Sequence, residues 1–155
     1  MGKKTIKYGR DPVVLLAAFA HLAAFFLIFL NLPNNSAFGP TSDEAYITSR
    51  MWLALLCSYL LGLGDACYNT QLYAIVGSLY STDSAPAFAL YKFAQSVAAA
   101  IAFFYSSHVG LHDQLLILTV SCLIGTFTFW LVIWRYEGRT RGYSEIQAEG
   151  RLRRD

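Results

Sequence analysis

The chain has 155 residues, of which 55% are hydrophobic and only 14% are charged. Soluble domains carry about a quarter charged residues, so this composition indicates a membrane protein and argues against a soluble enzyme. The net charge of +2 gives no reason to expect a nucleic-acid partner. All three cysteines lie inside apolar stretches, which argues against an extracellular disulfide framework. Their spacing offers no metal site, and we expect no cofactor.

Four apolar runs are long enough to cross a membrane as helices, which takes about 20 residues each. The first run is too long for the apolar region of a signal peptide, and no small-residue cleavage site follows it. The fold class is therefore an all-α integral membrane protein with four transmembrane helices in the lipid bilayer. We expect these helices at about residues 13–32, 52–80, 86–105 and 115–134.

The basic residues predict the orientation of the four helices. They flank the first helix on its N-terminal side and the last helix on its C-terminal side, at Lys3, Lys4, Lys7, Arg10, Arg135, Arg139 and Arg141. Cytoplasmic connections carry the excess of Lys and Arg, so we expect a multi-pass protein with both termini cytoplasmic. Residues 1–12 would form a basic cytoplasmic N-terminus. Residues 135–155 would form a cytoplasmic tail that is disordered or weakly helical.

The longest connection, residues 33–50, is then predicted to face the lumen or the exterior. It carries a glycosylation sequon at Asn34-Asn35-Ser36. Asn34 lies almost at the membrane edge, where the modifying enzyme reaches poorly. The same residues are also ordinary turn formers. Asn34 is therefore a possible glycosylation site, with turn formation as the alternative.

The second helix carries the most informative residues. At 100° per residue, four small or polar residues fall on a stripe about 60° wide, called the polar stripe here: Ser58, Gly62, Asp65 and Asn69. Lipid cannot satisfy such polar atoms, so the stripe should face protein or a water-filled cavity. Two interpretations stay open. The stripe lines a solute or proton pathway, or it packs on a neighbouring helix, with Gly62 allowing close approach and Asp65 bonding a Ser or Thr.

Lys92 in the third helix has the charge to pair with Asp65, but the two residues are expected at different depths in the membrane. Counted from the cytoplasmic helix ends at 1.5 Å per residue, Asp65 lies about 22 Å deep and Lys92 about 9 Å deep. We therefore predict that Lys92 extends to the cytoplasmic interface. Lys92 and Gln95 remain candidates for cavity lining or coupling. For His21, in the middle of the first helix, neutral packing is favoured over a proton relay.

Gly62-Leu63-Gly64-Asp65 also matches the Gly-x-Gly-Asp motif of the intramembrane aspartyl proteases, the presenilin-like family. That chemistry needs two aspartates that share a proton. The other aspartates lie outside the predicted helices. Asp11 is in the N-terminal segment, Asp155 is in the tail, and the connections hold Asp43, Asp83 and Asp113. The downstream Pro-Ala-Leu of that family is absent too. We therefore expect no catalytic residue and no enzyme.

Four segments resemble the Unc-93-like branch of the major facilitator superfamily in their order and spacing. They are residues 29–33 (Phe-Leu-Asn-Leu-Pro), 61–71 (Leu-Gly-Leu-Gly-Asp-Ala-Cys-Tyr-Asn-Thr-Gln), 84–93 (Ser-Ala-Pro-Ala-Phe-Ala-Leu-Tyr-Lys-Phe) and 102–106 (Ala-Phe-Phe-Tyr-Ser). The resemblance runs from about residue 9 to about residue 137. It implies a fold of twelve helices in two halves, of which this chain would supply the last four, a partial major facilitator fold.

The resemblance also implies a function. Such proteins transport a solute by rocking two halves around a midplane site, which four helices cannot form. We therefore expect a fragment of an Unc-93-like solute carrier, acting on an unidentified small solute and not transport-competent alone. Its partner would be the missing N-terminal helices or another membrane protein. The alternative is a membrane-embedded regulator or trafficking partner of a channel or receptor.

Overall fold

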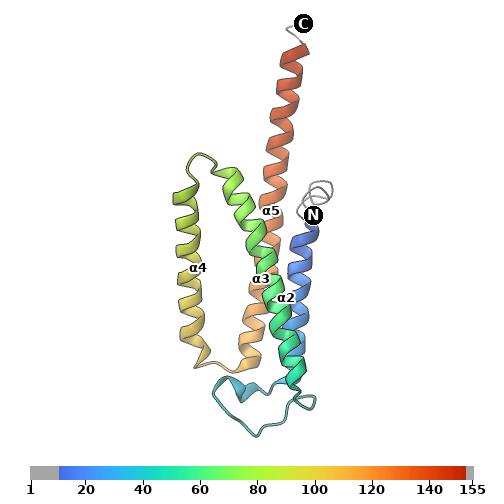
Figure 1. Cartoon of the computed structure of the whole chain (residues 1–155), viewed down its shortest axis with the longest axis vertical. Coiled ribbons are helices and arrows are strands. Elements are labelled where there is room, and N and C mark those ends of the chain that lie inside the picture. Colours follow the sequence, from blue (N-terminus) through green and yellow to red (C-terminus); the bar gives the residue numbers. More distant parts are fainter. Residues whose placement is uncertain (1–10, 153–155) are drawn as a thin grey trace.

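The computed structural model describes the backbone of residues 11–152 and the side chains of residues 12–135. Within this range the chain forms four long helices, one 3₁₀ turn and no strand (Figure 1). The elements are α2 (Asp11–Asn31), η1 (Asn34–Ala37), α3 (Met51–Leu79), α4 (Ser84–Ser106) and α5 (Leu111–Leu152). The basic residues at positions 3, 4, 7 and 10 lie outside the described residues, as do the side chains of Arg139 and Arg141.

The four predicted transmembrane helices are confirmed. Each long helix contains a stretch that is long and apolar enough to cross a membrane: Pro12–Asn31, Met51–Leu79, Ser84–Ser106 and Leu111–Arg135. Successive helices run in opposite directions, so the start of α2 and the end of α5 lie at the same end of the molecule (Figure 1). This is the arrangement that four consecutive membrane crossings require.

Each long helix begins before its predicted range, by one residue in α3, two in α2 and α4 and four in α5. Pro86 lies in the first turn of α4, where the backbone N–H groups have no acceptor inside the helix, so a proline is tolerated there. The first turn of α5 contains His112, Asp113 and Gln114, and an acidic side chain is favourable at the positive end of the helix dipole. The backbone of α5 also continues as a helix beyond Arg135 to Leu152. The composition of that segment predicts a disordered or weakly helical tail, and the structure shows the helical alternative.

α2 forms the centre of the packed part of the molecule. It lies against α3 over most of its length and against α5 over a smaller area. Four small residues of α2 are buried, Ala17, Ala18, Ala20 and Ala24. Small side chains let membrane helices approach closely, which maximises van der Waals contact where lipid supplies no hydrophobic driving force. Near the start of α2, a cluster of Val14, Ile75, Phe129 and Ile133 joins α2, α3 and α5.

α4 stands apart from this three-helix unit (Figure 1). None of its residues is buried. Its side-chain contacts with α3 include two aromatic pairs: Tyr73 meets Phe88 and Tyr91 edge to face, with ring centroids 5.7 and 5.8 Å apart. Such pairs are worth about 0.5–1.5 kcal/mol each beyond the area they bury. Within the described residues, most of the surface of α4 is therefore open to lipid or to further helices.

Candidate functional site

The polar stripe of α3 points away from α2, the helix on which α3 mainly packs. The residues of α3 that are buried form another stripe, called the buried face here: Leu53, Cys57, Gly64, Gln71 and Ile75. At 100° per residue the centres of the two stripes lie about 130° apart. Ser58, Gly62 and Asp65 are exposed, and Asn69 is half-buried. The stripe that the sequence singled out is thus on the side of α3 that this chain leaves largely uncovered.

Asn69 connects the polar stripe to α4. Its side-chain nitrogen Nδ2 donates to the backbone oxygen of Asp65, at 3.0 Å. Its oxygen Oδ1 accepts a hydrogen bond from the Tyr91 hydroxyl of α4, also at 3.0 Å. Both ends of the Asn69 amide are therefore occupied, and the side of α3 that carries the stripe is the side that faces α4.

Lys92 and Gln95 lie together on α4, close to the same aromatic side chains. Lys92 Nζ donates to Gln95 Oε1 at 2.8 Å. The same ammonium group lies 5.1 Å from the centroid of the Tyr73 ring and 5.5 Å from that of Tyr91. A cation at this distance is attracted by the electron-rich face of an aromatic ring. Lys92 is thus held by Gln95 and two tyrosines, and forms no ion pair with Asp65 among the described residues.

Within the described residues, another helix comes close to α3 at Gly64 and not at Gly62. A Cβ atom built at Gly62 would have no neighbour within 4 Å. A Cβ at Gly64 would overlap the imidazole ring of His21 in α2 and would lie 3.1 Å from the Ala17 oxygen. Among the described residues, no helix approaches Gly62 closely. The signal that could have found Gly64 is its spacing of seven residues from both Cys57 and Gln71.

His21 occupies the space that Gly64 leaves. Its Nδ1 lies 2.9 Å from the Ala17 oxygen. Because a carbonyl oxygen only accepts, Nδ1 must carry the proton in this bond. The ring also lies 5.5 Å from the Tyr68 ring and 5.8 Å from the Phe25 ring, centroid to centroid. In this chain His21 is a packing residue of the interface between α2 and α3.

Tyr68 links α3 to α5. Nothing in the sequence pattern predicted this role. Its hydroxyl lies 2.5 Å from Thr126 Oγ1 and 3.8 Å from Cys122 Sγ. Thr126 Oγ1 donates its own proton to the Cys122 oxygen, at 2.7 Å. Tyr68 is consequently the donor to Thr126. This bond links α3 to α5 at a position about 60° around α3 from Asp65, because three residues turn a helix by about 300°.

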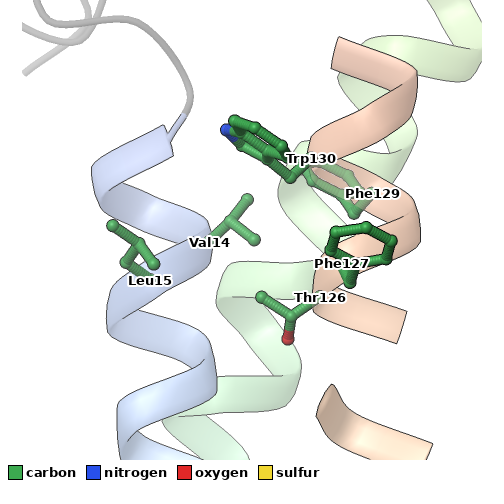
Figure 2. A pocket seen from close by; sticks show the side chains of 6 residues that line it. All are labelled: Val14, Leu15, Thr126, Phe127, Phe129 and Trp130. Carbon is green, nitrogen blue, oxygen red and sulfur yellow. The ribbon is translucent and has the colours of Figure 1, made fainter. Parts of the chain in front are cut away.

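None of four cavities found among the described residues is lined by the polar stripe. A groove of about 390 Å³ lies between α2 and α5, and Figure 2 shows its lining of Val14, Leu15, Thr126, Phe127, Phe129 and Trp130. A second, of about 500 Å³, lies between α3 and α5, with Tyr68 and Cys122 in its wall. Both are mainly apolar and open outward, so lipid tails can fill them. Neither marks a polar solute site. The described residues also contain no cluster of three metal-ligating side chains.

Comparison with known proteins places the chain in a family. The model of the family described as "Ion channel regulatory protein UNC-93" matches residues 1–130. UNC93-like protein MFSD11 of Xenopus laevis is 51% identical over 130 residues, which are 82% of this chain and 29% of that protein. MFSD11 of Xenopus tropicalis is 48% identical over 137 residues, 86% of this chain and 31% of that protein.

A more distant relative, protein unc-93 homolog A of Mus musculus, is 31% identical over 116 residues, 74% of this chain and 22% of that protein. No solved structure matches. The chain spans less than a third of the length of these curated relatives. The family match covers all but the last part of the chain, and it agrees with the four apolar helices. This chain therefore belongs to the UNC-93 family, the Unc-93-like branch of the major facilitator superfamily.

Proposed function

We propose that this chain is the part of an Unc-93-like solute carrier that supplies one wall of the solute cavity, and that it does not transport by itself. One observation carries the proposal: Asp65 lies deep in an apolar helix, yet is exposed on the side turned away from α2. A carboxylate at the centre of a bilayer costs about 3 kcal/mol or more. Water in a cavity or a further polar helix would remove that cost, whereas lipid would not.

The exposed polar side chains of α4 support the same proposal. Lys92, Gln95 and Ser96 are all exposed within a membrane-spanning helix that has no buried residue. Polar groups at this depth normally face the interior of a bundle. The relatives are about three times as long as this chain, so they have enough additional chain to cover this side of α3 and α4. The chain's partner is then the N-terminal helices of the longer protein.

In this proposal Asp65 and Asn69 line the cavity, with Ser58 and Gly62 beside them. Lys92 and Gln95 serve in lining or coupling, and no residue is catalytic. The solute is small and polar enough to use a carboxylate and an amide. The family description names ion channel regulation. No contact among the described residues favours a role as a regulator or trafficking partner.

The charge at Asp65 should be needed for activity but not for assembly. In a chimera where this chain replaces the matching segment of the Xenopus laevis relative, we expect Asp65→Asn to accumulate normally and to abolish solute-driven proton movement. Asparagine keeps the shape and hydrogen bonding of aspartate but cannot carry its charge or release a proton. The measurement uses proteoliposomes, a pH-sensitive dye and a panel of amino acids, sugars and organic cations.

Asp113→Asn is the matched control, because Asp113 is an exposed aspartate in the first turn of α5. It should leave the flux unchanged. The 155-residue chain alone should give no flux. If Asp65→Asn transports like the parent while Asp65→Leu fails to accumulate, the residue serves packing and the cavity proposal is wrong.

We also propose that both termini face the cytoplasm, as the positions of the basic residues favour. Single cysteines placed at Ser42 and Val109 should then react with a membrane-impermeant maleimide added outside intact cells. Cysteines placed at Thr5 and Ser144 should react only after permeabilisation. The parent chain is the control for the three native cysteines, which lie within membrane spans. Labelling at Thr5 in intact cells would refute this topology.

A further inference from the structure

The first turn of α5 lacks a capping side chain of its own. The Gly110 oxygen accepts the first helical hydrogen bond, from the backbone nitrogen of Gln114 at 3.1 Å, so Gly110 occupies the N-cap position. A helix begins with four backbone N–H groups that have no partner inside the helix. An N-cap side chain normally accepts from the second or third of these. Glycine has no side chain with which to do so.

Asn34 supplies this missing group from another part of the chain. Its Oδ1 accepts a hydrogen bond from the backbone nitrogen of His112, the second residue of α5, at 2.9 Å. The two residues are 78 positions apart in the sequence. The bond therefore ties the connection after α2 to the beginning of α5, in the way that an ordinary N-cap ties a helix to its own preceding loop.

The absence of a side chain at Gly110 is what lets Asn34 come this close. A Cβ atom at Gly110 would lie 2.6 Å from Asn34 Oδ1 and 2.7 Å from Asn34 Nδ2, closer than real Cβ contacts come. Gly110 does not have a positive φ, so its backbone would accept another residue. The glycine is thus required for space and not for conformation.

The turn that carries Asn34 is held by local hydrogen bonds. The Ser36 hydroxyl donates to the Pro33 oxygen at 2.6 Å, and the Ser36 backbone nitrogen donates to the same oxygen at 3.1 Å. The backbone nitrogen of Phe38 donates to the Asn35 oxygen at 3.0 Å. These bonds form the 3₁₀ turn η1, whose first residue is Asn34. The serine of the sequon thus shapes the turn that positions the asparagine.

We propose that Asn34 supplies the capping side chain of α5 across the loop, and that the Asn34-Asn35-Ser36 sequon is not used for glycosylation. Asn34 is exposed, but a glycan is attached through Nδ2, which would lie only 2.7 Å from a Cβ at Gly110, so the glycan would emerge against the start of α5. Asn34 also follows the end of α2 by only three residues, close to the membrane edge. In this proposal the sequon arises because Asn34 serves capping and Ser36 serves the turn.

The test is a mutant cycle on the full 155-residue chain in detergent micelles, read as the thermal unfolding midpoint. Asn34→Asp keeps the accepting oxygen and should unfold close to the parent, because a carboxylate is also favourable at a helix N-terminus. Asn34→Ala should lower the midpoint by about 2–4 °C, the shift expected for the loss of one typical cap. Gly110→Ser alone should also lower it, because its side chain meets the Asn34 amide.

The decisive variant is the double substitution Asn34→Ala with Gly110→Ser. Removing the amide frees the space, and the serine then caps its own helix, so this variant should unfold at a higher temperature than either single one. If Asn34→Ala fails to accumulate, recovery of expression in the double variant reports the same rescue. Asn35→Ala, which loses only an exposed bond to Asp43, is the matched control and should change little.

Two results would overturn the proposal. One is an Asn34→Ala chain as stable as the parent, or a double variant no better than Asn34→Ala, since either would show that Asn34 does not cap α5. The other is a glycan on Asn34 in protein made in eukaryotic cells, detected as a mass shift that an endoglycosidase removes. Unmodified Asn34 peptide together with the rescue is the expected outcome.

Discussion

Substitution of Gly64 by alanine is expected to destabilise the chain by about 1–3 kcal/mol, the usual cost of forcing extra volume into a packed site. The added Cβ would overlap the His21 ring and would lie 3.1 Å from the Ala17 oxygen, which belongs to the backbone of α2. The His21 ring cannot simply rotate away, because its Nδ1 is bonded to the same oxygen. The helices must therefore separate, which weakens the largest interface of the molecule.

Gly62→Ala is the matched control, half a turn earlier in the same helix. Its Cβ meets nothing within 4 Å. Alanine is also a better helix former than glycine by about 0.5–1 kcal/mol. This variant should be as stable as the parent or slightly more stable. Thermal unfolding of both variants in the same detergent gives the comparison.

A second substitution in α2 makes the Gly64 experiment specific. If the clash with His21 is the cause, Gly64→Ala should cost less in a His21→Ala background than in the parent, because the ring is then absent. A double-mutant cycle measures this difference directly. Equal effects of alanine at Gly62 and Gly64 would contradict the assigned packing of α2 on α3.

Asn31→Leu is expected to cost about 1–3 kcal/mol, the penalty of leaving a buried polar group without its partner. Asn31 is only 2% exposed although it ends a membrane helix. Its Oδ1 accepts from the backbone nitrogen of Arg50 at 2.8 Å, and its Nδ2 lies 3.4 Å from the Arg50 oxygen. Leucine has the same branched skeleton of side-chain heavy atoms but no polar atom, so both hydrogen-bonding groups that face Arg50 are lost.

The expected readouts are a lower unfolding midpoint and faster proteolysis within residues 33–50. Asn31 joins the end of α2 to Arg50, the N-cap residue of α3, so its loss should loosen both ends of that connection. Asn35→Leu is the control, because Asn35 is exposed and bonds only to Asp43. If the two leucine variants proteolyse at the same rate, Asn31 does not clamp the connection.

The number and type of helices followed from the sequence because the bilayer sets a length of about 20 apolar residues per helix. The boundaries followed less well where polar residues belong to a helix. Asp113 and Gln114 lie in the first turn of α5, although their polarity alone indicates a loop. Asn34 could be recognised as a turn residue or a sequon, but nothing local shows that it bonds to His112, 78 residues away.

The polar stripe of α3 was visible in the sequence because polar side chains are rare in membrane helices and therefore stand out. The buried face was not visible. In a soluble helix the apolar side marks the core, but a membrane helix is apolar on every side, so periodicity does not say where a neighbour lies. Gly62 and Gly64 are indistinguishable by type and differ only in which neighbours they meet.

By itself, the sequence determined that this protein is a four-helix membrane chain, that it belongs with the Unc-93-like proteins, and that Asp65 is its most costly side chain to place in lipid. Hydropathy, short motifs and residue type carry that information, and all three are local. Only the tertiary structure decided that Gly64 seats His21, that Tyr68 bonds to Thr126, and that Asn34 caps α5. These contacts join residues distant in the chain, and their partners are selected by shape and free hydrogen-bonding groups, which become defined only when the helices pack.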